Sequence, residues 1–221
     1  MATWIVHLRV AEIFAKKYDF IDEYNFFAGN LAPDCGYGQK DSFGEFQPPP
    51  MVTHWTDTGS KRDCKYKEFY EKYLKNKEKD NAYSFYLGYY IHLMTDVMWS
   101  ATFCIPTYTK YADEYSKNPE FLRVIKLDWN DQDFRYLNEK PDFVPYNLLD
   151  ERMGRINDYL PYYEENQLTK QIRFIIDNYK TPVSGRDIYR EYVYLNRESI
   201  DNFVLTASEM IDMDIVKKNL V

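Results

Sequence analysis

Two residues four positions apart carry the strongest chemical signal in the chain. His92 and Asp96 lie in a stretch that is apolar nearly throughout, so a helix there places both side chains on one buried face. An ionised carboxylate on such a face is unfavourable without a partner, and a neutral imidazole brings no charge. A divalent cation would satisfy both, since imidazole nitrogen and carboxylate oxygen are normal zinc ligands. A simple hydrogen-bonded pair has the same spacing, so the pair alone leaves both interpretations open.

The other candidate ligands lie closer to the N-terminus. Asp34 begins a segment rich in Gly and Pro, His54 lies towards the end of that segment, and His7 falls on the apolar face of a predicted first helix. Taken singly, Asp34 is typical of a turn, His54 of a surface loop and His7 of a core histidine. One shared metal explains all five residues more simply than a separate, unrelated role for each of them. The sequence therefore predicts a metal site made of His7, Asp34, His54, His92 and Asp96.

The elements that must position these residues are predicted to be helices. A helix over about 80–103 is apolar nearly all round, which predicts the buried centre of a bundle, and Pro106 is expected to end it. Residues 29–60 are dense in Gly and Pro and predict a long functional loop. Because alternating β-branched runs are missing, we expect an all-α fold, with residues 1–221 as one multi-helix domain. Further helices are predicted at about 2–17, 19–28, 63–76, 117–127, 129–138, 150–160, 166–179 and 195–218.

The charge balance restricts the class of partner. The formal net charge is −7 and the sequence has no cluster of Lys and Arg. This balance argues against binding to duplex nucleic acid and against adhesion to an anionic membrane surface. A small phosphorylated substrate or a phospholipid remains compatible, because a bound metal supplies positive charge locally.

The expected compartment is the cytoplasm. The N-terminus lacks the pattern of a signal peptide, and no apolar stretch reaches the roughly 20 residues that span a bilayer. The cysteines Cys35, Cys64 and Cys104 are odd in number and widely spaced, which is typical of free thiols in a reducing compartment. The oligomeric state is not predicted.

Four motifs, taken in order, resemble the zinc-dependent phospholipase C family, which is related in fold to the S1/P1-type nucleases. The motifs are His7-Leu8-Arg9-Val10-Ala11, Gly29-Asn30-Leu31-Ala32-Pro33-Asp34, Thr53-His54-Trp55 and Leu87-Gly88-Tyr89-Tyr90-Ile91-His92-Leu93-Met94-Thr95-Asp96. The resemblance covers about residues 1–105. It implies an all-α fold, a cluster of up to three zinc ions and hydrolysis of phosphate esters.

By this resemblance, each candidate residue acquires a role. Asp34, His54, His92 and Asp96 would bind one metal, and Asp96 would bridge to a second metal that His7 also binds. Asp34 is in addition the candidate general base. Trp55, in the loop, is the candidate substrate contact, whereas Tyr89 and Trp99 are more typical of core packing.

The chain also departs from the family pattern. Secreted members begin with a Trp whose free amino group and carbonyl bind zinc, but Trp4 follows three residues here. No histidine follows His92, so the remaining metal site is missing or uses carboxylates such as Asp113 or Glu114. We therefore expect one or two zinc ions.

Two hypotheses about function follow. One is a metal-dependent hydrolase of phosphate esters that uses a zinc-bound water. The alternative is a non-catalytic helical protein whose four ligands close a structural zinc site. Asp57 is either a partner that orients His54 or, more simply, a solvated loop acid.

Overall fold

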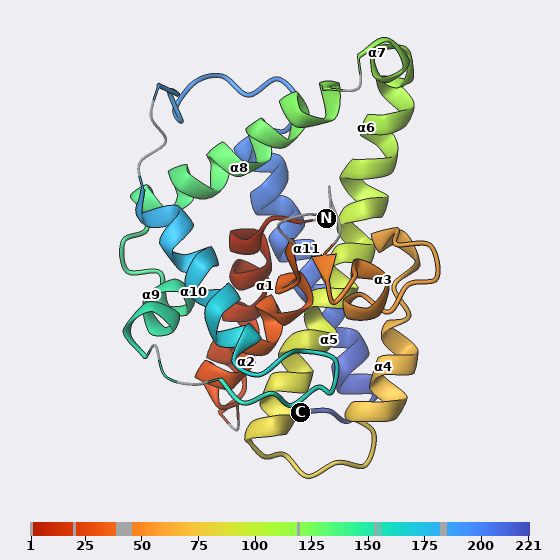
Figure 1. Ribbon diagram of the computed structural model, residues 1–221, viewed down its shortest axis with the longest axis vertical. Coiled ribbons are helices and arrows are strands. Elements are labelled where there is room, and N and C mark those ends of the chain that lie inside the picture. Colours follow the sequence, from red (N-terminus) through yellow and green to blue (C-terminus); the bar gives the residue numbers. More distant parts are fainter. Residues whose placement is uncertain are drawn as a thin grey trace.

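The computed structural model describes residues 2–19, 21–38, 46–118, 120–152, 154, 156–181 and 185–221. Helices dominate, and within these residues the β-structure is one antiparallel pair of two-residue strands, β1 (Tyr37–Gly38) and β2 (Phe46–Gln47) (Figure 1). The predicted all-α fold is confirmed. The helices are α1 (Trp4–Lys17), α2 (Glu23–Leu31), α3 (Pro50–Thr53), α4 (Tyr66–Tyr73), α5 (Asn81–Trp99), α6 (Ile105–Lys110), α7 (Ala112–Lys117), α8 (Phe121–Glu139), α9 (Val144–Glu151), α10 (Gln167–Lys180) and α11 (Arg197–Lys217), with the 3₁₀ helices η1 (Ala32–Asp34) and η2 (Lys61–Asp63) and the π-helical stretch η3 (Ser100–Cys104).

Helix α5 lies at the centre of the bundle, as predicted. Helices α1, α2, α4 and α11 all contact it, and Figure 1 shows it in the middle of them. Its Phe85, Tyr89, Tyr90 and Trp99 are among the largest fully buried side chains. Because apolar side chains leave α5 in every direction, the helix is stabilised by burial on all faces rather than along one stripe.

Two glycines allow α2 and α5 to cross with their backbones in contact. A Cβ atom at Gly88 would lie 2.0 Å from the carbonyl oxygen of Phe26, and one at Gly29 would lie 2.0 Å from that of Phe85. Only glycine fits at such a crossing. The close approach brings Asn30, at the end of α2, to within hydrogen-bond distance of α5.

The predicted end of the central helix at Pro106 is wrong. After α5 the chain passes through η3 and continues as α6, so that Pro106 lies in the first turn of a further helix. Proline is tolerated there, because the first turn of a helix needs no amide hydrogen from it. The π-helical stretch changes the hydrogen-bond register just before the proline, which allows the chain to continue.

The second half of the chain differs from prediction at two places. The two helices expected over 117–127 and 129–138 are one helix, α8, and the helix expected over 150–160 is wrong, because α9 begins at Val144 and ends at Glu151. Pro145 occupies the first turn of α9, where it favours a helix start instead of a break. The helices expected over 166–179 and 195–218 are confirmed as α10 and α11.

The Gly- and Pro-rich segment is not wholly irregular. In its described parts, 29–38 and 46–60, it holds the end of α2, the short helices η1 and α3, and both strands. The second predicted helix begins at Glu23, not at residue 19, because the Asp22 side chain caps it by accepting from the Asn25 amide at 2.8 Å. Across the ranges that the structure describes, no helix has the length and apolar character that a membrane crossing requires.

Candidate metal centre

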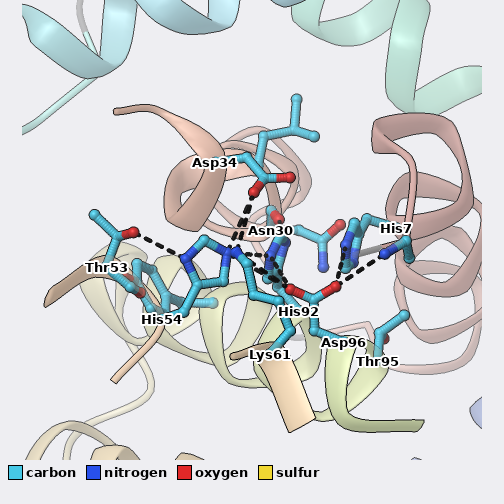
Figure 2. A network of polar contacts seen from close by, with 12 residues as sticks. His7, Asn30, Asp34, Thr53, His54, Lys61, His92, Thr95 and Asp96 are labelled. Atoms are coloured by element: carbon cyan, nitrogen blue, oxygen red, sulfur yellow. Dashed lines mark hydrogen bonds and ion pairs between the residues drawn. The ribbon is translucent and has the colours of Figure 1, made fainter. Parts of the chain in front are cut away.

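All five predicted ligands lie together at the centre of the bundle (Figure 2). His7 comes from α1, Asp34 from η1 and His54 directly follows α3, while His92 and Asp96 lie one turn apart on α5. The exposed fraction of these side chains ranges from 0% to 6%. Three segments that are far apart in the sequence therefore converge on the polar face of an otherwise apolar helix.

Four donor-atom pairs among Asp34, His54, His92 and Asp96 have the separations found in a tetrahedral zinc site. His54 Nε2 lies 3.2 Å from Asp34 Oδ1, 3.3 Å from His92 Nε2 and 3.5 Å from Asp96 Oδ2, and His92 Nε2 lies 3.5 Å from Asp96 Oδ2. Zinc bonds of about 2.0–2.2 Å in tetrahedral geometry place ligand atoms roughly 3.3–3.6 Å apart. These four pairs therefore already have the spacing of zinc ligands.

Hydrogen bonds turn the free nitrogens of both imidazoles towards the other predicted ligands. His92 Nδ1 donates to the Asn30 carbonyl at 2.7 Å, and because a carbonyl only accepts, Nε2 of the neutral ring keeps its lone pair. His54 Nδ1 lies 2.9 Å from the Thr53 hydroxyl. His54 Nε2 and His92 Nε2 face each other at 3.3 Å, and one N–H···N hydrogen bond joins the neutral rings when the Thr53 hydroxyl donates to His54 Nδ1. Asn30 and Thr53 therefore orient the predicted ligands, as partners behind metal-binding imidazoles commonly do.

The Tyr89 hydroxyl fixes the segment that carries His54. It donates to the Thr53 carbonyl and receives a hydrogen bond from the Tyr162 hydroxyl at 2.7 Å. This contact joins the end of α3 to the middle of α5, so His54 and His92 are held in one frame.

His7 is stacked on His92 and is a further available donor. The two rings are 3.7 Å apart at an angle of 6°, and His7 Nε2 lies 3.5 Å from Asp96 Oδ1. Burial, together with repulsion from His92, lowers the pKa of His7 to about 4, so the ring is neutral at pH 7. Neither of its nitrogens has a hydrogen-bond partner. Donor atoms of His7, Asp34 and His92 lie within 4.8 Å of one another, and so do those of His54, His92 and Asp96.

Asp96 is an ionised carboxylate in the interior. Burial alone would raise its pKa, but the Lys61 charge and the imidazoles of His7 and His92 beside it hold the pKa well below the usual range. Its Oδ1 accepts the Ala2 amide at 3.0 Å, while its Oδ2 has no hydrogen-bond partner, and the same is true of Asp34 Oδ2. Buried carboxylate oxygens that accept no hydrogen bond are unfavourable, and a bound metal ion would satisfy them.

Lys61 is the residue of the centre that the sequence did not reveal. Its side chain is 14% exposed, and its Nζ lies 3.5 Å from Asp96 Oδ2 and 3.6 Å from Asp34 Oδ1. It comes from η2, where Lys61 and Arg62 resemble an ordinary solvated turn. No spacing rule connects it to the ligands, because the turn is brought to α5 only by the fold.

The remaining predicted residues lie outside the cluster. Trp55 is partly buried against Phe69 and Tyr73, with its backbone in the left-handed region at φ 52°. Asp57 is 74% exposed and binds Lys65 at 2.6 Å, so it is a solvated acid. The partner of His54 Nδ1 is the Thr53 hydroxyl instead. Helix α7, which carries the exposed Asp113 and Glu114, lies at the top of Figure 1, far from α1 and α3. These carboxylates therefore do not rebuild the remaining metal site.

The cysteines add no ligand to the cluster. All three belong to the described part of the chain, are buried and form no disulfide. Burial raises the pKa of Cys64 to about 12 and that of Cys35 well above its usual value, so both stay protonated at pH 7. The candidate metal centre is consequently one of nitrogen and oxygen donors.

Comparison with known proteins yields one match. Residues 4–109 match the family model described as "Zinc dependent phospholipase C". The matched range contains every residue of the cluster, Lys61 included. No curated protein and no solved structure matches the chain, so the predicted relation to the nuclease fold stays a prediction.

Proposed function

Residues 4–109 belong to the zinc-dependent phospholipase C family, and from this premise we propose that the protein is a zinc-dependent hydrolase of phosphate esters whose substrate is a phospholipid. We further propose that residues 1–221 form one domain. The observation that carries the proposal is the set of four donor-atom pairs, each 3.2–3.5 Å apart, that join Asp34, His54, His92 and Asp96 inside the matched range. We propose that Asp34, His54, His92 and Asp96 bind one zinc ion, and that His7 with Asp96 holds a second when two are present.

The proposed roles follow from the chemistry of the residues. Zinc, when bound, supplies Lewis acidity towards a phosphoryl oxygen and lowers the pKa of a water ligand to about 7. Asp34 accepts a proton from the attacking water through Oδ2, the oxygen that has no hydrogen-bond partner. The Lys61 ammonium lies beside Asp34 and Asp96, two of the proposed zinc ligands. A phosphoryl group at the metal would therefore be close to this cation, which offsets the negative charge that develops on it. Trp55, partly exposed beside His54, is the proposed substrate contact.

A specific observation also supports a structural metal. Four protein ligands complete a tetrahedral zinc, which leaves no open position for water. Asp34, His54, His92 and Asp96 would supply four such ligands without His7. The second candidate function is therefore a non-catalytic helical protein that zinc stabilises.

Metal content and turnover, measured on matched variants, test both candidates. Elemental mass spectrometry of the untagged protein should give one or two zinc ions per chain. Asp96→Asn should lower bound zinc by about tenfold or more, because it removes the charge of a proposed ligand that lies 3.5 Å from each of the three imidazoles. Asp57→Asn makes the same chemical change at an exposed position and should leave zinc unchanged.

The outcomes separate the hypotheses. Zinc-dependent hydrolysis of a chromogenic phosphodiester or a short-chain phospholipid supports the enzyme. Unfolding on chelation, with no turnover of any ester, supports the structural site. Full zinc content and full stability in Asp96→Asn would show that the ligand assignment is wrong.

A further inference from the structure

A cavity of about 510 Å³ lies between the start of α1 and the helices of the second half of the chain. Ala2, Thr3 and Trp4 line one side of it, and residues of α8 and α10 line the other. The cavity is separate from the metal centre but shares a residue with it. Ala2 lines the cavity and also donates its amide hydrogen to Asp96 Oδ1 at 3.0 Å.

The charge of the lining is opposite to that of the protein. Among the described lining residues, Lys126 and Arg186 are cationic and none is acidic, although the whole chain has a net charge of −7. Asn130 and Asn178 add neutral amide groups. Although Arg186 also binds Asp131, a lining with two cations and no carboxylate of its own favours an anionic ligand.

Two hydrogen-bond donors of the lining residues are buried without a partner. They are the indole nitrogen of Trp4 and Nε of Arg186. The Arg186 guanidinium binds Asp131 at 2.9 Å through Nη2, so its Nε is left over. Buried donors without acceptors are rare, and an oxyanion is the kind of acceptor that such donors lack.

Aromatic rings form the apolar part of the lining. Tyr179 contacts the edge of Trp4 at a centroid distance of 6.1 Å and packs against Phe134 at 5.0 Å, and Trp129 also faces the cavity. Rings of this kind bury hydrocarbon well. The volume lies within the range typical of small-molecule sites, which combine an apolar wall with a few polar groups.

We propose that this cavity binds a lipid phosphate, with its oxyanion at Lys126 and Arg186 and its acyl chain on the rings of Trp4, Trp129, Phe134 and Tyr179. The choice of phosphate as the head group rests on the proposed function, whereas the anionic and apolar character of the ligand rests on the cavity alone. The second half of the chain, which carries no recognisable motif, then supplies the lipid-binding part of the protein.

The test is a titration of the full chain with dihexanoylphosphatidic acid below its micelle concentration, followed by calorimetry. It is performed on both chelated and zinc-loaded protein. Lys126→Glu should weaken binding by about tenfold or more in both forms, because repulsion replaces attraction at the head group. Lys67→Glu makes the same charge reversal on α4, away from the cavity, and should bind as tightly as the unmodified protein. Lys126 is exposed, so its replacement should not impair folding, and thermal unfolding checks this.

Two further probes identify what is recognised. Inorganic phosphate should bind far more weakly than the lipid phosphate, since it lacks the chain, and dihexanoylglycerol should bind weakly because it lacks the charge. Equal affinity of Lys126→Glu and unmodified protein, or equal affinity for inorganic and lipid phosphate, would overturn the proposal. A protein that holds no zinc and shows no turnover would refute the proposed function. The titration of chelated protein would still show whether the cavity binds the lipid phosphate.

Discussion

The metal centre and the cavity meet at Ala2 but are built in contrasting ways. The centre is nearly sealed, and its His54 Nε2 lies within 3.2–3.5 Å of donor atoms of Asp34, His92 and Asp96. The cavity is an open volume of about 510 Å³ with cations and aromatic rings. Metal affinity depends on ligand distances, so a displacement of a fraction of an ångström disrupts it. Ligand affinity at a cavity depends on volume and charge, so it changes gradually with each substitution. Substitutions should therefore act almost all-or-none at the centre and by degrees at the cavity.

The largest effect is expected at the crossing of α2 and α5. Gly88→Ala places a Cβ 2.0 Å from the Phe26 carbonyl oxygen, and this contact is with backbone that cannot rotate away. The helices must separate, which should lower the free energy of unfolding by about 3 kcal/mol or more. Asn30 would move away from His92, so zinc should be lost together with stability. Denaturant unfolding and elemental analysis measure both quantities.

Gly154→Ala is the matched control for this substitution. A Cβ there would have its nearest neighbour at 3.5 Å, which is ordinary contact. Its stability and zinc content should equal those of the unmodified protein. If Gly88→Ala behaved like this control, the metal centre would not depend on the close crossing of α2 and α5. Its response to substitution would then not be all-or-none.

An intermediate effect is expected at Lys61, which distinguishes the metal-free from the metal-loaded centre. Lys61→Met leaves Asp34 and Asp96 without their counter-charge, so metal-free protein should lose about 1–3 kcal/mol of stability. Zinc-loaded protein should lose less, since the metal supplies the charge. Removal of a competing cation should also tighten zinc binding.

Thermal unfolding with and without zinc measures this difference, and a competition titration measures the affinity. Arg62→Met removes an exposed charge from the same short helix and should change neither. A Lys61→Met variant with unaltered metal-free stability and unaltered zinc affinity would mean that the ammonium does not act on the carboxylates.

The sequence predicts the metal ligands better than it predicts the cavity. His92 and Asp96 were identified because four-residue spacing on an apolar helix is a local property, and His7, Asp34 and His54 because they lie in recognisable motifs. Lys61 and the cavity were missed, because each arises from segments that only the tertiary structure brings together. The sequence predicts a helix end at Pro106 and no helix across Pro145, yet a proline in a first turn begins a helix, and sequence alone does not distinguish the two cases.

Asp133, beside the cavity, should affect the pH dependence of stability and leave zinc binding unchanged. Its carboxylate accepts from the Thr3 hydroxyl at 2.6 Å and from the Tyr179 hydroxyl at 2.7 Å, and both of these residues line the cavity. Burial raises the pKa of Asp133 to about 7, although Thr3, Tyr179, the Ile5 amide and Arg9 favour the charged form. In the unfolded chain its pKa is about 3.9. Stability from this group is therefore complete below about pH 4 and is lost as the pH rises towards 7.

Asp133→Asn should flatten that dependence. Between pH 4 and 7 the folded protein holds a proton that the unfolded chain has released, so the carboxyl contributes a fall of up to about 1.4 kcal/mol per pH unit. Denaturant unfolding of both proteins across this range, in the presence of a chelator, isolates the contribution as a difference between their slopes. Parallel slopes would show that Asp133 does not titrate as argued. Zinc content of the variant should be unchanged, because Asp133 contacts no proposed ligand. A loss of zinc would mean instead that the segment before α1 couples the cavity to the metal centre, through Thr3 on one side and Ala2 on the other.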